Sequence, residues 1–478
     1  MEATPLQIGW NSFSSWLSDQ LYQAPPGRYY RGWWIDTTWF WVSPTSTAEL
    51  KHTFASDINA IFSQDRVNQT WKRIYWLKNW TIYENATLRA TIAWTAKQGY
   101  NIGYMKPIWA TVYKLYYFHY DIPTINPKRI HRSNEDWTLF EENYKDYTAN
   151  TWSISVWPPW QPNWMIVISE WERILFSYYN TIWQISNSEV VTKLIEFPSE
   201  QNVVGITEFQ WEYKVYTTAW FSTSKIYRWD WLSNLPDLSI DLKGLAITGW
   251  VWSLWAYDYF IADGSFYQVA WVQYQELYRG INGRIMSSYD NKIIIEMLQP
   301  WSVMALCEYS NRPWYSKWIH PITIIDINSK DNWIWAIDYN QNWLIFASFE
   351  KLYLQFWTPE TPTTWTVDTF IESLTFIWDN IQFRKKIDNA IFKFSWFTTQ
   401  NISFYAEINN NWPWIKIWEW NNNSVSSTNY GIQLPSNSFL NQLWNFNTIR
   451  FKVVMSHNWT RQWTFYWIDL FGKQNIWK

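Results

Sequence analysis

Glycine is scarce in this sequence, which has 13 glycines among its 478 residues, whereas average usage near ~7% would give about 33. Cys307 is the single cysteine, which excludes an intramolecular disulfide and any metal site built from several cysteines. No stretch reaches the roughly 18 apolar residues of a membrane span, and Met1 to Trp10 lacks the pattern of an export signal. We therefore expect a soluble chain that is not exported and needs no metal or cofactor.

An excess of charge of either sign is also lacking, since 38 lysines and arginines against 41 aspartates and glutamates give a net charge of -3. Proteins that bind nucleic acids or anionic membranes usually carry a basic face that neutralises phosphates. We accordingly expect neither a nucleic acid nor a membrane as a partner.

Tryptophan, in contrast, is abundant, with 45 copies. A tryptophan selected for packing should recur on one face of a strand or helix, because its large apolar ring has to be buried. Many of these follow Asn or Asp beside strand-like runs, where a hairpin turn favours glycine because its central residues need positive φ. Seven such pairs occur: Asn79-Trp80, Asp136-Trp137, Asn163-Trp164, Asp230-Trp231, Asn332-Trp333, Asn342-Trp343 and Asn458-Trp459.

We interpret many of these tryptophans as glycines of the living protein. Some lineages translate the UGA codon as glycine, whereas an alternative codon table translates the same codon as tryptophan. Together, 45 tryptophans and 13 glycines make 58 residues, a glycine content suited to a turn-rich protein. The alternative is a truly tryptophan-rich protein, such as one with a carbohydrate-binding surface. If the glycine interpretation holds, the rings of Trp80, Trp343 and Trp459 should be exposed, because no pocket was made for them.

The N-terminal region differs from the rest in composition. Residues 1–47 are rich in Pro, Ser, Gly and Trp with little periodicity, which predicts an extended arm that lies against a neighbouring subunit. Ser46-Thr47-Ala48-Glu49 then has the form of a helix capping box, and apolar residues from Leu50 to Ile61 follow at helical spacing. This predicts one short helix, the only helix that we expect.

From about Lys72, short runs of Ile, Val, Tyr, Phe and Thr alternate with turn residues, as in consecutive antiparallel strands. Hairpins are predicted within Met165–Tyr178, Tyr257–Val269 and Trp335–Phe356. Such units without helical crossovers can form four-stranded blades of ~40–50 residues each. We predict a β-propeller of about six blades over residues 48–365, with a pair of β-sandwiches or a β-helix as alternatives.

A stretch rich in Pro and Thr, Thr358–Thr364, predicts a domain boundary near residue 365. Beyond it, five runs alternate like strands: Ser373–Ile377, Ala390–Phe394, Ile402–Ile408, Ile449–Met455 and Thr464–Leu470. About 100 residues suit a small β-sandwich, which we assign to residues 366–478. The predicted fold class is therefore all-β.

This layout resembles structural proteins of tailed-phage virions. The resemblance lies in a long aperiodic propeller followed by a C-terminal sandwich, with a start at Glu372-Ser373, the pair Lys385-Lys386 before a strand and the closing strand Arg450–Met455. It covers about residues 70–478 and brings no catalytic signature. It implies a component of a tail, neck or capsid, located in the virion and in the host cytoplasm during assembly, with other virion proteins as partners.

No motif predicts a catalytic or cofactor site. With Trp read as Gly, Trp250–Trp255 becomes G-x-G-x-x-G, but a strand follows where a dinucleotide site needs a helix, so we interpret it as an inter-strand loop. Cys307 lies in an apolar run and is expected in the core. The five histidines lack metal-ligand spacing and are expected to be surface or hydrogen-bonded residues: His52, His119, His131, His320 and His457.

A glycosidase would need two carboxylates about 5–10 Å apart, which a propeller can gather around its central channel. Six acidic residues lie in or beside predicted strands: Glu170, Glu172, Asp258, Asp263, Asp326 and Asp338. Turn chemistry explains Glu170, Glu172 and Asp263, and the polar face of a strand explains the others. We therefore assign no catalytic, cofactor-binding or metal-binding residue.

Three functions are compatible with these observations. The first is a non-enzymatic virion protein that works through protein–protein contacts in an oligomeric assembly. The second is a carbohydrate-binding or receptor-binding propeller, in which genuine tryptophans stack on the rings of surface glycans. The third is a polysaccharide-degrading enzyme that uses two of the carboxylates.

The gene sequence tests the glycine interpretation. We expect UGA codons at the seven Asn-Trp and Asp-Trp pairs, because these are the turn positions that select glycine. Sequencing of the gene checks this directly. UGG codons at these positions would show that the tryptophans are genuine.

Overall fold

All described elements of the protein are β-strands. The computed structural model describes residues 4–10, 29–33, 35–36, 43–44, 48–64, 72–92, 98–120, 129–146, 166–170, 172–178, 180–209, 212–219, 223–230, 236–254, 256–289, 292–299, 303–310, 319–324, 334–339, 343–356, 367–373, 375–377, 384–396, 401–409, 413–421, 428–434, 444–446, 448–457 and 464–475. Within these segments, no helix has the length and hydropathy that a membrane crossing requires. The predicted all-β class is confirmed.

The chain divides into two compact units. Unit 1 comprises Met1–Ala48, Ile294–Lys330 and Phe356–Lys478, and unit 2 comprises Glu49–Ile293 and Asp331–Gln355. Each unit is therefore assembled from segments that lie far apart in the sequence.

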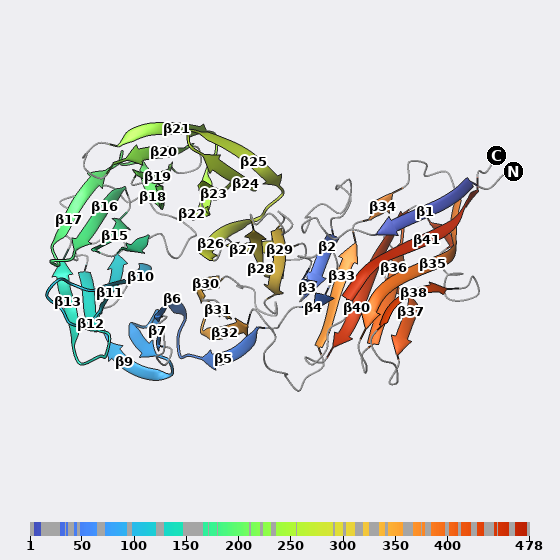
Figure 1. Ribbon diagram of the computed structural model, residues 1–478, viewed down its shortest axis with the longest axis horizontal. Helices are drawn as coiled ribbons and strands as arrows, with labels where there is room; N and C mark the ends of the chain where they lie inside the picture. Colours follow the sequence, from blue (N-terminus) through green and yellow to red (C-terminus); the bar gives the residue numbers. More distant parts are fainter. Residues whose placement is uncertain are drawn as a thin grey trace. The chain divides into compact units, whose positions relative to one another are not determined.

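Unit 2 is a β-propeller, in which four-stranded antiparallel sheets, the blades, follow one another around a common centre (Figure 1). Five blades are continuous in sequence, each with its strands in chain order: β6 (Ile58–Gln64), β7 (Lys72–Leu77), β8 (Thr81–Glu84) and β9 (Thr87–Thr91); β10 (Gln98–Met105), β11 (Lys114–Tyr120), β12 (Arg129–Asn134) and β13 (Phe140–Asp146); β14 (Val167–Ser169), β15 (Arg173–Tyr178), β16 (Thr181–Ser186) and β17 (Val191–Glu196); β18 (Gln201–Phe209), β19 (Glu212–Ala219), β20 (Thr223–Trp229) and β21 (Asp237–Lys243); β22 (Ile247–Leu254), β23 (Tyr257–Ala262), β24 (Ser265–Ala270) and β25 (Gln273–Arg279).

Another blade combines the two ends of the unit. It has the order β30 (Ile334–Tyr339), β31 (Trp343–Ser348), β32 (Lys351–Phe356) and β5 (Glu49–Thr53). The register of β32 and β5 pairs Lys351 with Thr53 and Leu354 with Glu49. Because the first strand of the unit completes its last sheet, this pairing closes the ring. A further strand, β26 (Gly283–Tyr289), pairs in parallel with β22.

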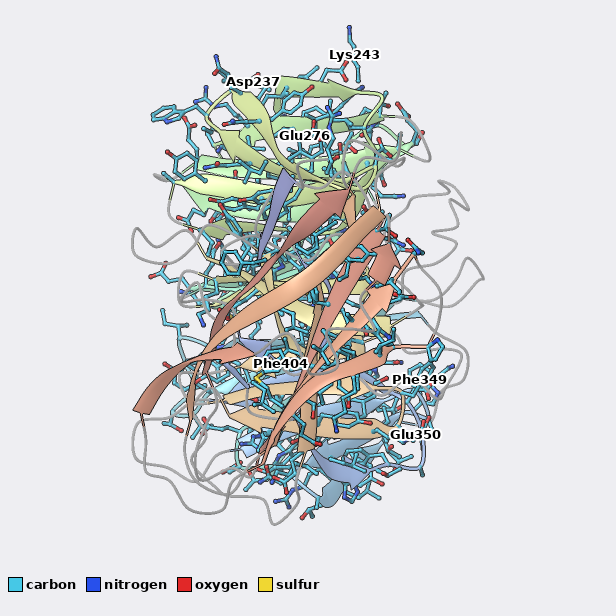
Figure 2. All side chains as sticks on the ribbon, turned by 90° about the vertical axis from the view of Figure 1, so that its right-hand side faces the viewer. Asp237, Lys243, Glu276, Phe349, Glu350 and Phe404 are labelled. Atoms are coloured by element: carbon cyan, nitrogen blue, oxygen red, sulfur yellow. The ribbon has the colours of Figure 1, made fainter. Side chains whose placement is uncertain are left out.

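Burial within a blade falls from the second strand to the fourth. The side chains of β15 and β23 are almost all buried, whereas those of β9 and β5 are almost all exposed. On the outermost strand β21, Asp237 and Lys243 at its two ends project outward (Figure 2). This gradient is that of a propeller, in which inner strands are covered by neighbouring blades and outer strands face water.

The hydrophobic core of unit 2 lies between adjacent blades. One cluster joins Tyr116 and Phe118 of β11 to Phe176 of β15 in the next blade. Further clusters join β7 to β11, β15 to β19, and β19 to β23 in the same way. Each blade is therefore stabilised mainly by its neighbours.

Unit 1 contains two antiparallel sheets. One has the order β1-β41-β35-β38, with β39 paired to β35, and the other has the order β2-β33-β40-β36-β37, with β34 paired to β40. Two further strands, β3 (Ile35–Asp36) and β4 (Ser43–Pro44), pair with each other. The remaining bounds are β1 (Thr4–Trp10), β2 (Tyr29–Trp33), β27 (Lys292–Gln299), β28 (Val303–Ser310), β29 (Ile319–Ile324), β33 (Val367–Ser373), β34 (Phe376–Ile377), β35 (Arg384–Trp396), β36 (Asn401–Ile408), β37 (Ile415–Asn421), β38 (Thr428–Leu434), β39 (Trp444–Phe446), β40 (Thr448–His457) and β41 (Thr464–Asn475).

Two predictions for the N-terminal region are wrong. The arm contains strands of unit 1: β1 pairs with β41 from Thr4–Gln474 to Trp10–Ile468, and β2 pairs with β33. The predicted helix is absent, because residues 49–53 and 58–64 form β5 and β6. The apolar residues at helical spacing fall on two strands separated by a bend, and pairing with β32 and β7 replaces helical hydrogen bonds.

The predicted hairpins are confirmed. Tyr257–Ala262 turns through Asp263 and Gly264 into the next strand, and Asp263 and Gly264 have φ of 45° and 72°. The hairpins β14–β15 and β30–β31 also lie where the sequence places them. The predicted linker at residues 358–364 lies outside the described residues.

Among the described residues, three tryptophans have the backbone conformation that favours glycine. φ is 70° at Trp80, 60° at Trp137 and 55° at Trp271. Trp80 and Trp137 are the two tryptophans of Asn-Trp or Asp-Trp pairs whose turns are fully described. The expected exposure of the Trp80 ring is wrong, because the ring is half-buried against the core between β7 and β11. The side chain of Trp343 and all of Trp459 lie outside the described residues.

We expect Trp271→Gly to stabilise unit 2, because a residue with a Cβ pays about 1–2 kcal/mol for a left-handed backbone and the ring is 66% exposed. Trp229→Gly is the matched control, since the Trp229 ring is 2% exposed and its removal leaves a cavity that costs about 3–5 kcal/mol. Thermal melts of both variants measure the change. A lower melting temperature for Trp271→Gly would show that this turn does not require glycine.

Candidate functional site

The central channel of the propeller is the candidate binding site. It encloses a cavity of about 530 Å³ within unit 2. Its lining comes from seven strands around the channel, β6, β10, β14, β18, β22, β26 and β30, and from Tyr213 on β19.

Glu170 and Asp338, two of the six acidic candidates, line this cavity. The Glu170 carboxylate accepts a hydrogen bond from the Tyr213 hydroxyl at 2.6 Å and another from Arg173 Nε at 2.6 Å. The Asp338 carboxylate accepts a hydrogen bond from the backbone amide of Ser63. Both carboxylates therefore hold blades together, Glu170 with β19 and Asp338 with β6.

The rest of the wall combines polar and aromatic groups. Arg284 is buried and donates from Nη2 to the carbonyl oxygen of Ile334 at 2.7 Å. Glu208 is exposed, and Trp250 and Trp252 contribute indole rings. The Trp252 Nε1 atom is buried without a hydrogen-bond partner among the described residues. The wall can thus offer donors, acceptors and flat apolar surface to a ligand.

Asp258 on β23 carries a buried carboxylate and does not line the cavity of the channel. It accepts hydrogen bonds from the Tyr216 hydroxyl at 2.6 Å, Lys214 Nζ at 3.0 Å and Ser253 Oγ at 2.6 Å. Burial, followed by the charge of Asp258, raises the pKa of the Tyr216 phenol, which therefore keeps its proton and donates it. The carboxylate is fully engaged by its own and the preceding blade.

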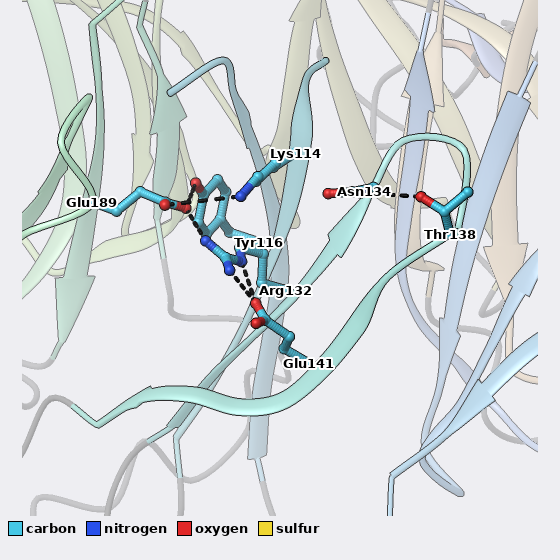
Figure 3. A network of polar contacts seen from close by, with 7 residues as sticks. All are labelled: Lys114, Tyr116, Arg132, Asn134, Thr138, Glu141 and Glu189. Atoms are coloured by element: carbon cyan, nitrogen blue, oxygen red, sulfur yellow. Dashed lines mark hydrogen bonds and ion pairs between the residues drawn. The ribbon is translucent and has the colours of Figure 1, made fainter. Parts of the chain in front are cut away.

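A second buried network joins the blades that begin with β10 and β14 (Figure 3). Glu189 Oε1 accepts hydrogen bonds from the Tyr116 hydroxyl and from Arg132 Nη1, both at 2.5 Å, and Glu189 Oε2 lies 3.9 Å from Lys114 Nζ. Arg132 Nε also donates to Glu141 at 2.6 Å. Burial lowers the pKa of the Lys114 ammonium, and the Glu189 charge opposes this shift. Asn134 and Thr138 form a separate hydrogen bond at 3.1 Å in the adjoining turn.

The two networks share a pattern that the sequence analysis missed. Lys114-Leu115-Tyr116 on β11 and Lys214-Val215-Tyr216 on β19 both present a lysine and a tyrosine to a carboxylate of the next blade. The signal is a Lys-x-Tyr triplet on the second strand of a blade. It is hard to see because the carboxylate comes from a turn in one case and from a strand in the other.

The other singled-out residues do not join a common site among the described residues. Glu172 is exposed, and Asp263 lies in its turn, where it accepts a hydrogen bond from the Ala246 amide at 3.3 Å. Asp326 lies outside the described residues. Cys307 is buried, as expected, and burial raises the pKa of its thiol. The segment Trp250–Leu254 belongs to strand β22, so the expectation of a loop there is wrong.

The histidines are also separate. His131 is buried near Trp76, and His52 is exposed beside Phe54. His119, His320 and His457 lie on β11, β29 and β40. No group of three or more potential metal ligands occurs in the part of the chain that the structure describes.

No protein-family model and no curated protein matches the chain. Among solved structures, YCF48 bound to a D1 peptide has a TM-score of 0.45, with 10% identity over 66% of this chain and 96% of that chain. The WD40 propeller domain of Doa1 gives 0.38, with 11% identity over 65% and 96%. A lectin variant of Aleuria aurantia with alpha-methyl-L-fucoside gives 0.34, with 13% identity over 61% and 100%. Similarity at this level does not indicate what the chain binds.

We expect Glu189→Gln to lower the free energy of unfolding by about 3 kcal/mol, because it leaves the buried cations Lys114 and Arg132 without the charge that compensates them. Glu141→Gln removes a partner of the same arginine whose side chain is 34% exposed, and should cost less than about 1 kcal/mol. Urea unfolding of the two variants compares them. Equal losses of unfolding free energy in the two variants would mean that the burial of Glu189 adds nothing to the stability that the network provides.

Proposed function

We propose that the chain is a non-enzymatic structural component of a tailed-phage particle, part of its tail, neck or capsid, that works through contacts with other virion proteins. It would lie in the virion, and in the host cytoplasm during assembly. The observation that carries this proposal is the use of Glu170, Asp258 and Asp338 as links between strands and blades.

Carboxylates held in this way favour a rigid scaffold over pocket chemistry. A general acid or base must exchange a proton with a substrate, and one whose oxygens already accept hydrogen bonds from the protein would have to give them up first. Glu170 is held on both oxygens, by Tyr213 and Arg173. The ring is closed by β5 and its blades are linked by these carboxylates. Such a ring resists deformation, which supports a structural role.

We further propose that glycine occupies many of the printed tryptophan positions in the living protein. The positive φ of Trp80, Trp137 and Trp271 supports this, since a bulky residue there is a genuine outlier. Positive φ arises at both fully described Asn-Trp and Asp-Trp turns, as a glycine turn would require.

The alternative function is a carbohydrate-binding or receptor-binding propeller. The channel favours it, because the indole rings of Trp250 and Trp252 line the same cavity as the polar side chains of Asn59 and Asn101. Aromatic faces and amide groups together suit sugar rings. A glycan array probed with the purified chain separates the two functions: retention of a glycan that is lost in Trp252→Ala would favour the alternative.

Purified particles test the proposed function. We expect peptides of this protein in mass spectra of density-purified phage particles from the host, at a fixed ratio to the major capsid protein, because a structural component has a set copy number. A soluble host enzyme added before purification controls for carry-over. Absence from particles, together with a gene neighbourhood free of portal, terminase and tail genes, would refute a virion role.

A further inference from the structure

Exposed apolar side chains of unit 2 gather at one face. The described chain has twelve large apolar residues that are at least 37% exposed, and all of them lie at this face. Some lie in the turn between the first and second strands of a blade or in the turn between the third and fourth strands. The others are among the first two residues of a strand that begins at this face. The twelve residues are Leu50, Leu88, Ile108, Trp109, Val112, Leu139, Val190, Leu238, Tyr257, Trp271, Val272 and Tyr274.

These turns share a face because neighbouring strands are antiparallel. In a blade of four strands, the first turn and the third turn come at the same end. A backbone hydrogen bond of 3.0 Å from Ile108 to Asn187 joins the first turn of one blade to the third turn of the next. We call this end of the blades the turn face.

Five of the twelve residues form one patch on the turn face: Ile108, Trp109, Val112, Leu139 and Val190. The hydrogen bond from Ile108 to Asn187 holds the first loop beside the turn of Val190. A second bond of 3.2 Å, from the Glu135 amide to the Tyr113 carbonyl, holds the turn of Leu139 beside the same loop. The patch therefore spans three turns of two blades.

The patch has a rigid base. The centroid of the Trp109 ring lies 4.0 Å from Lys114 Nζ. Lys114 belongs to the network with Glu189 and Arg132 that Figure 3 shows. A cation over an indole face holds the ring in place and lowers the entropy lost when a partner covers it. Tyr144 packs its ring 3.6 Å from the Arg132 guanidinium.

The size of the patch fits the centre of a stable dimer. Exposed fractions of 37–75% correspond to on the order of 500 Å² of apolar surface, at about 150–250 Å² for a whole large side chain. A standard interface buries about 800 Å² on each partner, and its core is about 65% apolar. Four of the five residues are not tryptophan, so most of this area remains if residue 109 is glycine.

The charges also permit the patches of two copies to contact each other. Lys106 and Asp136 are the charged residues exposed in its described turns, and they have opposite signs. Exposed acids gather elsewhere on the turn face, on the blade of β18–β21, as Glu208, Asp230, Asp237 and Glu212, of which Glu212 is paired with Arg228. That blade would repel a copy of itself, whereas the patch would not.

We infer that this patch is the contact through which two copies of the chain associate. Two copies related by a two-fold axis through the patch would place Trp109 and Ile108 of each at the centre and Lys106 of one near Asp136 of the other. The inference deepens the proposed function, since oligomeric contact is the mode of action of a virion component, but its test does not depend on a particle.

Sedimentation of the purified full chain at rising concentration tests the inference. We expect the chain to sediment as a dimer by about 10 µM, and the double variant Ile108→Asp, Val190→Asp to lose at least about 100-fold in dimer affinity, because burying unpaired charges is costly. Leu238→Asp is the matched control: its leucine is 53% exposed on the same face but outside the patch, and dimer affinity should be unchanged.

If the unmodified chain sediments as a monomer at about 100 µM, the inference is overturned, and the patch would instead bind a different protein. A double variant that dimerises as well as the unmodified chain would overturn it too. Thermal melts show whether each variant is folded, and Ile108→Ser with Val190→Ser, which removes apolar area without charge, serves if the aspartates unfold unit 2. Dimers of a protein absent from particles would refute the virion role alone.

Discussion

The packing of a buried second strand against the next blade is the interaction on which unit 2 depends. A single four-stranded sheet has two apolar faces and cannot bury either one alone, so it gains stability only between neighbours. Phe118 against Phe176, with ring centroids 4.8 Å apart, is one such contact. Polar groups at the same seams share this burial and need partners: both oxygens of the Asp258 carboxylate accept hydrogen bonds there, whereas Glu189 accepts them at Oε1 and faces Lys114 with Oε2.

Turn chemistry made much of unit 2 predictable from sequence. Asp263-Gly264 marks a hairpin with its own positive φ, and the strand positions on either side follow from β-branched and aromatic residues. The glycine-like behaviour of Trp80 was predictable for the same reason, since it follows Asn79 between two strand-like runs. Its half-buried ring was not, because the space beside a turn is set by the neighbouring blade.

Other features of the fold and the site could not be predicted from the sequence, because they depend on pairing between segments that lie far apart in the chain. Strand β1 finds its partner at residues 468–474, and no local pattern in residues 4–10 carries that information. The apolar spacing from Leu50 to Ile61 fits a helix, but β5 and β6 gain hydrogen bonds from β32 and β7. The acidic residues were identified as candidates, yet their donors Tyr213, Tyr216 and Ser63 come from other strands. Tertiary context thus overrides local propensity at these positions.

Closure of the ring by β5 has a consequence for synthesis on the ribosome. Thr53 pairs with Lys351, so β5 is made almost 300 residues before its partner strand. At about 5–20 residues per second, β5 lacks its partner strand for roughly 15 s or longer. During that time its exposed backbone is a template for any other free strand edge. Two chains that are synthesised side by side can therefore exchange β5 by domain swapping.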